Sequence, residues 1–434
     1  MAQQHRDSRK HHDSLGRPIV AVTGMGVVTS LGAGKDDNWA ALTAGRSGIH
    51  AISRFPTEGL RTTIAGTVDF IPVEPFCAPL LSEQLATLAA EEAVSQAAIG
   101  SAGDFPGSLF IAVPPVEMEW PQRVALAKAS GQTGDITYAD LLKAAGSGDF
   151  KPWHNLFLFG TVADRIRERF GTKGSPISLS TACSSGATAI QLGVEAIRRG
   201  ENKAVLAIGT DGSVHAEALI RFSLLSALST QNDPPEEAAK PFSKNRDGFV
   251  MGEGAAALVL EDYDHAIARG ARILGIVAGV GEKGDGFHRT RSSPGGAPII
   301  AAIREAIADA GLTPDDVDYI NAHGTATPEN DRMEAHGLTA VLGERMGEVP
   351  ISSNKSMIGH TLTAAGAIEA VVSLMTIANG RLPPTINYRV PDPAIPLDVV
   401  PNVARDAQVT RVLSNSFGFG GQNTCLLFTA EPVT

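Results

Sequence analysis

The sequence predicts an α/β protein made of two pseudo-symmetric halves, each with a mostly parallel sheet that carries helices on both faces. Short apolar, β-branched runs alternate with Ala-rich helix-like segments along the chain, which is the pattern of covered parallel sheets. A Gly-Ala pair follows a strand and a loop twice, at Gly186 and at Gly366. The glycine that ends the next helix also recurs, at Gly200 and Gly380, so both features are displaced by 180 residues. Equal spacing over a strand, a loop and a helix indicates an internal duplication.

The two halves differ in length within their first parts. Each half has an Ala-rich helix before an apolar strand, with Glu92-Ala93 in the first half and Glu305-Ala306 in the second. These two helices are 213 residues apart in the sequence, rather than 180. The first half therefore holds about 33 additional residues. We place this inserted segment at about 114–159, an irregular stretch that contains Pro, Gly and Trp.

The domain boundaries follow from this repeat. Residues 1–17 are polar and lack an apolar signal segment, so we expect a disordered tail there. The first buried strand begins at Pro18. The Arg269-Gly270 turn is the expected boundary, which gives one half of residues 18–270 and a second half of residues 271–434.

Composition and charge exclude several classes of protein. With 434 residues, 43% of them apolar and 19% charged, the chain can bury a large core. The net charge of −11 argues against a nucleic-acid-binding or anionic-membrane protein, and no run approaches 18 apolar residues, so no membrane insertion is expected. Cys77, Cys183 and Cys425 are odd in number, far apart and outside CxxC pairs. They indicate neither a disulfide framework nor a zinc site, and they fit a reducing, cytoplasmic location.

Cys183 is the first candidate for chemistry. Apolar residues recur after it at helical spacing, at Ala187, Ile190, Val194 and Ile197, which places the thiol at the positive end of a helix dipole. That position lowers a thiol pKa and predicts a thiolate. The competing interpretation is a buried structural cysteine, the commoner fate of a lone Cys.

Two histidines occupy loops that follow strands. His323 comes after the apolar run 319–322, and His360 comes after the loop 354–359. Functional groups of α/β proteins collect at such strand ends. Either histidine alone could be a core or capping residue, but both together with Cys183 at a symmetry-related loop favour catalysis.

The motifs around these residues resemble those of the elongating (I/II) β-ketoacyl-acyl carrier protein synthases, with type II the closest. The similarity covers residues 18 to 430 and is weakest between 70 and 160. Two further stretches, Ala227-Leu-Ser-Thr230 and Arg246 through Gly254, match the same family. The four main motifs, in chain order, are Thr181-Ala-Cys183-Ser-Ser-Gly186, Asn321-Ala-His323-Gly-Thr325-Ala-Thr327-Pro328, Asn354-Lys355-Ser-Met-Ile-Gly-His360 and Asn415-Ser-Phe417-Gly-Phe419-Gly-Gly421.

The resemblance implies a fold and a reaction. The fold is thiolase-like, a duplicated αβαβα five-layer sandwich that works as a homodimer, which agrees with the 180-residue repeat. The reaction is a decarboxylative Claisen condensation of malonyl-carrier with an acyl group held on Cys183, as in fatty-acid elongation. Backbone N–H groups of Cys183 and Phe419 would form the oxyanion hole, and neutral His323 and His360 would donate hydrogen bonds to the enolate oxygen.

The resemblance also implies supporting roles. Lys355 would pair with Glu369 and hold the histidine loop, rather than transfer protons. No cofactor is expected, since the substrates are carried on the phosphopantetheine of an acyl carrier protein. The remaining implied positions are Thr325 and Thr327 for the pantetheine arm, Phe222 and Phe419 for the acyl pocket, and the neighbourhood of Asn321, Glu369, Ser414 and Asn415 for the monovalent cation that the family often holds.

Three departures from the family pattern point to a specialised elongator with its own carrier or an unusual acyl chain. The segment Val113 to Trp120 replaces the usual Gly-rich stretch beside the acyl pocket and dimer contact. Ser226 stands where a basic residue usually helps to dock the carrier, with Arg221 a potential substitute. Gln422 replaces the Thr that usually follows the last Gly-rich turn.

Two other functions compete with this prediction. A thiolase-like acyltransferase that does not decarboxylate would need a second catalytic cysteine in a C-terminal loop, and Cys425 lies instead in an apolar run. A non-catalytic ketosynthase partner subunit would lack the nucleophile, and Cys183 is present.

Overall fold

The computed structural model describes residues 11–74, 76–131 and 133–434. Two groups of five strands, one from each half of the chain and here called the first and the second sheet, form its framework. In spatial order, the first sheet contains β6 (Ile177–Leu179), β5 (Ser108–Ala112), β7 (Ala204–Asp211), β8 (Gly254–Asp262) and β1 (Val20–Thr29). The second contains β11 (Pro350–Ser352), β10 (Tyr319–Asn321), β15 (Arg411–Phe417), β16 (Gln422–Thr429) and β9 (Gly275–Gly284).

The two sheets repeat one another strand by strand. β5 pairs parallel to β6 and β7, while β8 pairs antiparallel to β7 and β1. β10 pairs parallel to β11 and β15, and β16 pairs antiparallel to β15 and β9. The duplication inferred from the 180-residue spacing is therefore confirmed, but the expectation of mostly parallel sheets is wrong. One reason is local, because the short turn between β15 and β16 can join only antiparallel strands.

The sheets meet at their inner edges. β1 and β9 pair antiparallel through Ala21 with Ile276 and Val22 with Gly275, which joins the two halves into one continuous sheet path. Two short strands extend it, β13 (Asp398–Val399) beside β11 and β2 (Gly32–Ala33) beside β1. The remaining elements are α1 (Lys35–Thr43), β3 (His50–Ala51), β4 (Ile64–Ala65), α8 (Ala216–Leu224), α9 (Tyr263–Ala268), α12 (Lys355–Ile358), β12 (Arg381–Leu382), β14 (Arg405–Asp406) and four short 3₁₀ segments, Pro235–Glu237, Pro314–Asp316, Gly343–Gly347 and Leu362–Ala364.

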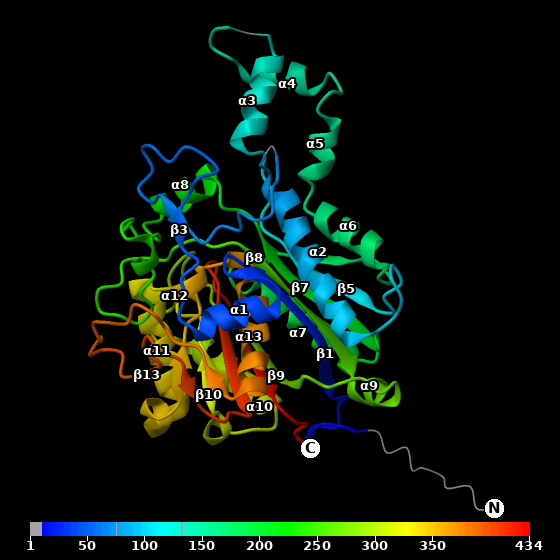
Figure 1. The fold of residues 1–434 in the computed structure, drawn as a ribbon, viewed down its shortest axis with the longest axis vertical. Helices are drawn as coiled ribbons and strands as arrows, with labels where there is room; N and C mark the ends of the chain where they lie inside the picture. Colours follow the sequence, from blue (N-terminus) through cyan, green and yellow to red (C-terminus); the bar gives the residue numbers. More distant parts are fainter. Residues whose placement is uncertain (1–10, 75, 132) are drawn as a thin grey trace, which may run out of the picture.

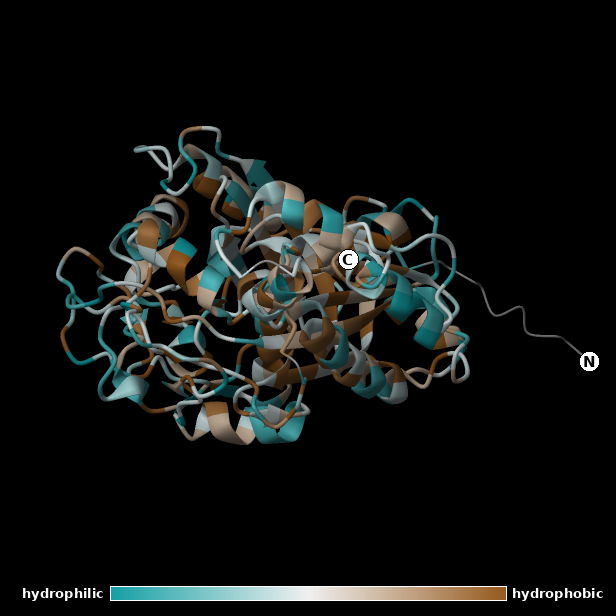
Figure 2. Cartoon of the chain, turned by 90° about the horizontal axis from the view of Figure 1, so that it is seen from above, coloured by the Kyte–Doolittle hydropathy of each residue, from teal (hydrophilic) through white to brown (hydrophobic). Residues whose placement is uncertain are grey.

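Helices form the other three layers. α7 (Ser185–Arg198) and α13 (Ala365–Asn379) lie between the sheets and contact strands of both. α2 (Ala78–Ala97) and α6 (Thr161–Phe170) cover the outer face of the first sheet, and α10 (Ala297–Asp309) with α11 (Pro328–Leu342) covers the second. This arrangement is the predicted thiolase-like αβαβα sandwich. Figure 2 shows hydrophobic residues concentrated in the central elements and hydrophilic ones toward the outer loops.

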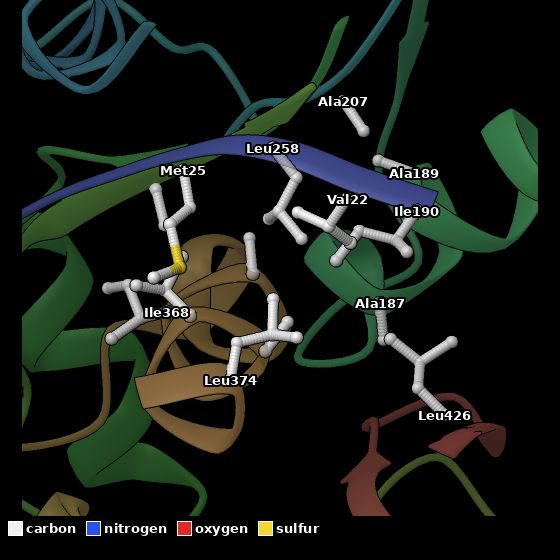
Figure 3. Packing of buried hydrophobic residues seen from close by; sticks show 14 of the residues in the cluster. Val22, Met25, Ala187, Ala189, Ile190, Ala207, Leu258, Ile368, Leu374 and Leu426 are labelled. Carbon is white, nitrogen blue, oxygen red and sulfur yellow. The ribbon is translucent and has the colours of Figure 1, made fainter. Parts of the chain in front are cut away.

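The central layer packs through one apolar cluster. Figure 3 shows Met25 of β1 beside Ile368 of α13, and Ala187 of α7 near Leu426 of β16. α13 and the turn before it, residues 362–379, are apolar and long enough to cross a membrane, alone among the helices of the described residues. Most of this stretch is buried between the sheets, as in the core helix of a soluble protein.

The repeated Gly-Ala pairs mark the contact between the two central helices. A Cβ atom added to Gly186 would lie 2.6 Å from the backbone nitrogen of Ala367, and one added to Gly366 would lie 2.6 Å from that of Ala187. Only glycine permits such a close approach of two backbones. The two Gly-Ala pairs that repeat in the sequence therefore contact each other in the structure.

Two segments differ in detail from expectation. Residues 1–10 of the expected tail lie outside the described residues, but 11–17 are packed against the body, where Arg17 donates to the Asp309 carboxylate at 2.5 Å and His11 contacts Asp264 at 2.6 Å. The segment predicted to be inserted holds three helices that project from the sandwich (Figure 1), namely α3 (Trp120–Ala129), α4 (Tyr138–Ala145) and α5 (Lys151–Leu156).

Replacing Gly186 by Ala should lower the free energy of unfolding by about 1–3 kcal/mol, since the new methyl meets backbone that cannot move aside. Chemical denaturation measures the change. Gly160→Ala is the matched control, because φ is −81° there and nothing lies within 4 Å of the added Cβ. Equal losses in the two variants would contradict the assigned contact.

Candidate active site

The structure brings Cys183, His323 and His360 together at the floor of one pocket. Their potential ligand atoms, the sulfur and one ring nitrogen of each histidine, all lie within 4.8 Å of one another. The two imidazole rings are 5.3 Å apart between centroids and nearly perpendicular, at 83°. All three side chains are buried. Each follows a strand, since β6 precedes Cys183, β10 precedes His323, and β11 with α12 precedes His360.

The backbone is strained close to each of these three side chains. Ala182, directly before Cys183, has a φ of 51°. Ala326, between the two threonines of the His323 loop, has a φ of 67°, and Leu362, two residues after His360, has a φ of 45°. Non-glycine residues adopt this left-handed conformation at a cost and are concentrated at functional sites. All three site loops therefore carry strain that the surrounding packing must hold.

The pocket is open to solvent at its mouth and holds about 60 Å³ of free space. Phe222 and Phe419 line it, as the resemblance implied. Phe222 packs edge-on against Phe249, whose ring packs in turn against His360, with 5.3 Å between centroids in both pairs. These aromatic rings form an apolar wall beside the imidazole.

Thr325 and Thr327 also line the pocket. Their hydroxyl oxygens lie 2.9 Å apart, and the Thr327 hydroxyl accepts the N–H of Asn330 at 3.2 Å, which caps α11. Turn formation and substrate contact are therefore compatible roles for these two residues.

The predicted thiolate form of Cys183 is wrong for the resting protein. Burial raises the pKa of Cys183 to about 11, which outweighs the backbone N–H of Phe419 and the charge of Lys355 that lower it. The sulfur does lie just before α7, but the sequence could not show how deeply the thiol is desolvated. Its proton must therefore leave as the sulfur attacks.

Both imidazoles are neutral. Burial is the main cause that lowers the pKa of His323 and of His360 well below 6.5, and the charge of Lys355 lowers both further. The Nδ1 atom of His360 accepts the N–H of Leu362 at 3.3 Å, so the proton of the neutral ring sits on Nε2. That N–H has no hydrogen-bond partner among the described residues and is free to donate to a substrate.

Lys355 and Glu369 form the expected buried ion pair. The Lys355 ammonium donates to the Glu369 carboxylate and, at 2.6 Å, to the backbone carbonyl of His323. Burial raises the pKa of Glu369 to about 7, while the charge of Lys355 opposes that rise. The contact with the His323 carbonyl fits a positioning role for Lys355.

Glu334 is the important residue that the sequence reasoning missed. Its fully buried carboxylate accepts the backbone N–H of His323 at 2.8 Å and of Gly324 at 2.7 Å, and the side-chain amide of Asn415 at 3.1 Å. The available signal was helical spacing, because Glu334 shares a face of α11 with the apolar Leu338. Glu334 lies in a charged stretch of the sequence, so its burial could not be recognised from the sequence.

Oxygen atoms at the implied cation position fit such an ion. The Asn321 amide donates to the carbonyl of Glu369 at 3.1 Å, and Ser414 and Asn415 are buried in the middle of the neighbouring strand β15. Glu369 Oε2 and Asn415 Oδ1 have no hydrogen-bond partner in the described part of the chain. Carboxylate and amide oxygens are suitable donors for a hard cation.

Comparison with known proteins places the chain. Residues 18–76 and 114–266 match the N-terminal domain of the β-ketoacyl synthases, and residues 274–389 match their C-terminal domain. The chain belongs to the β-ketoacyl synthase family. It is 38% identical to a putative polyketide β-ketoacyl synthase 1 of Streptomyces cyaneus, over 94% of this chain and 97% of the relative. It is also 38% identical to 3-oxoacyl-[acyl-carrier-protein] synthase 2 of Coxiella burnetii, over 94% and 98%.

Solved structures of ketosynthases share the fold. A type II PKS acyl-carrier protein in complex with its ketosynthase bound to the hexaketide gives a TM-score of 0.84 at 31% identity, covering 96% of this chain and 100% of that chain. The ishigamide ketosynthase/chain length factor gives 0.81 at 33% identity, covering 96% and 100%.

The rival functions fit this β-ketoacyl synthase less well. Cys425 is fully buried in β16 and lines no part of the catalytic pocket, so it cannot act as the second cysteine of a thiolase. Cys183 is present at the pocket floor, unlike in a non-catalytic partner subunit. Of the departures, Ser226 is exposed with a φ of 51°, and the Gln422 amide donates to Glu282 at 2.6 Å.

Alkylation of Cys183 by iodoacetamide should be slow at neutral pH and should accelerate about tenfold per pH unit, because the thiolate fraction rises by that factor below a pKa of about 11. Peptide mass spectrometry measures the rate. Cys77, with a pKa raised by burial to about 12, and Cys425 serve as internal controls. A rate already maximal at pH 7 would contradict the protonated resting thiol.

Proposed function

We propose that this chain is a β-ketoacyl-acyl carrier protein synthase, an acyltransferase that condenses a malonyl thioester with an acyl group held on Cys183. The observation that carries the proposal is one thiol and two neutral imidazoles within 4.8 Å at the floor of a single pocket. A thiol supplies the covalent carrier, and neutral imidazoles supply hydrogen-bond donors for an enolate.

The first half-reaction loads Cys183. Its sulfur attacks the thioester carbonyl of the acyl substrate, and the carrier thiol leaves with the proton that Cys183 loses. The Phe419 N–H already contacts the sulfur, and the Cys183 N–H donates to no other described residue. Both groups can therefore stabilise the oxyanion of the tetrahedral intermediate.

The second half-reaction forms the new bond. The bond between the malonyl carboxylate and its α-carbon breaks, carbon dioxide leaves, and the electron pair forms an enolate. The Nε2–H of His360, with His323 beside it, donates to the enolate oxygen. The enolate carbon then attacks the acyl carbonyl and releases Cys183 as a thiolate, which regains a proton.

Buried residues around the histidines hold this geometry. Lys355 fixes the His323 carbonyl, and Glu334 fixes the His323 and Gly324 N–H groups. A monovalent cation held by Asn321, Glu369, Ser414 and Asn415 would balance the buried carboxylates there. The proposal includes no other cofactor.

The partners are proposed from the relatives. One similar structure is a ketosynthase in complex with its acyl-carrier protein, and others are ketosynthases with a chain length factor. We propose that the substrates of this chain are carried on the phosphopantetheine arm of a carrier protein. We also propose that the chain forms a homodimer and works in the cytoplasm. The chain length factor complexes favour a second candidate, the catalytic subunit of such a pair.

Replacing His323 or His360 by Ala should lower malonyl decarboxylation about 10²–10³-fold, because each removes an enolate donor. The rate of acyl transfer to Cys183, which mass spectrometry measures, should fall much less. His336→Ala is the control, since that histidine is exposed on α11. Parental decarboxylation in either active-site variant would remove that histidine from the mechanism.

Replacing Glu334 by Gln should lower the kcat of condensation about tenfold while acylation of Cys183 changes little, because the neutral amide holds the His323 and Gly324 N–H groups less strongly. Steady-state kinetics and mass spectrometry separate the two effects. The exposed Glu344→Gln is the control. Equal losses in both half-reactions would assign Glu334 a purely structural role.

A further inference from the structure

We propose that Arg289 and Arg291, at the mouth of the catalytic pocket, bind the phosphate of the substrate's phosphopantetheine arm. The inference rests on the proposed function, because it names the part of a carrier-bound substrate that these two residues recognise. Both arginines line the same pocket as Cys183, and both are exposed to solvent.

The two guanidinium groups are free to take an anion. Neither has a carboxylate within 4.0 Å among the residues that the structure describes, whereas many arginines of this chain are ion-paired. Arginine presents a planar fork of N–H donors that matches phosphate. Two unpaired forks at one pocket mouth form a cationic site in a chain whose net charge is −11.

The acidic residues of the pocket do not cancel this charge locally. The two carboxylate oxygens of Asp285 accept the N–H groups of Phe287 at 3.1 Å and Ser293 at 2.7 Å. Glu329 is paired with Arg332 at 2.7 Å. Both carboxylates are therefore already engaged away from Arg289 and Arg291.

The loop that carries the arginines is held against the catalytic turn. The N–H of Asp285 donates to the carbonyl of Gly421 at 2.8 Å, and the N–H of Gly420 donates to the carbonyl of Arg289 at 2.8 Å. These bonds tie residues 285–289 to the Gly-rich turn that contains Phe419. The backbone of the cationic loop is thus fixed relative to the sulfur at the pocket floor.

The chemistry along the pocket matches the substrate arm. The thiol and imidazoles at the floor face the reacting thioester, the hydroxyls of Thr325 and Thr327 can bond the amides of a pantetheine chain, and the arginines stand at the open end. In phosphopantetheine the phosphate lies at the end opposite the thioester. Burial decreases in the same order, since the thiol, the imidazoles and Thr325 are buried, Thr327 is half-buried, and Arg289 and Arg291 are exposed.

The other expected cationic position offers no substitute. Ser226 carries no charge, and the guanidinium of Arg221 is ion-paired with Glu117 at 2.7 Å. Among the described residues that line the pocket, Arg289 and Arg291 are therefore the arginines without a carboxylate partner.

The experiment compares malonyl-phosphopantetheine with malonyl-pantetheine, which lacks only the phosphate. The parent enzyme should have a KM for the phosphorylated substrate roughly tenfold lower than for the other, and the double variant Arg289→Gln, Arg291→Gln should lose that preference. Arg272→Gln is the control, since Arg272 is also exposed and unpaired among the described residues but lies outside the pocket. It should keep the parental preference.

A second readout does not require turnover. Free phosphopantetheine should protect Cys183 from alkylation better than pantetheine does, and the double variant should remove that difference. Absence of condensation with an intact protection difference would overturn the proposed function but not the phosphate site. An unchanged preference in the double variant would overturn the site. So would a defect seen only with carrier-bound substrate, which would assign the arginines to the carrier's protein surface.

Discussion

Contact between the backbones of α7 and α13 is the constraint on which the site depends. The two helices touch through Gly186 and Gly366, near their first turns. Cys183 lies just before α7 and His360 just before α13, so the same contact brings the nucleophile and one imidazole face to face. A larger residue at either glycine would separate the loops as well as the helices. The catalytic geometry of this fold therefore depends directly on the packing of its core.

Burial between the sheets then determines the protonation state of each group. It lowers the pKa of His323 and His360, which keeps them neutral and able to donate, and it raises the pKa of Cys183 to about 11, which favours the protonated thiol. The same low dielectric makes buried charges costly, so Lys355, Glu369 and Glu334 are retained with hydrogen bonds to one another or to the histidine loop. Lys355 and Glu334 hold the backbone at His323 and Gly324, and Glu369 pairs with Lys355.

The pocket changes character from floor to mouth. The floor is desolvated and has neutral imidazoles, the wall of Phe222 and Phe249 is apolar, and the mouth carries arginines that have no acidic partner among the described residues. This gradient suits a long thioester whose reacting end is neutral and whose other end is anionic. Ser226 stands where the resemblance implies a basic residue, and the exposed Arg289 and Arg291 lie on the loop after β9.

The sequence by itself determined the duplication and the three residues of the pocket floor, and the resemblance that its motifs carry implied the five-layer fold. Each of these depends on local patterns, namely the 180-residue spacing of Gly-Ala pairs and the short motifs around Cys183, His323 and His360. Only the tertiary structure decided the antiparallel half of each sheet, the order of residues 11–17, the raised thiol pKa and the part played by Glu334. The physical reason is that strand direction, desolvation and buried hydrogen bonds depend on neighbours far away in the chain, which no local pattern contains.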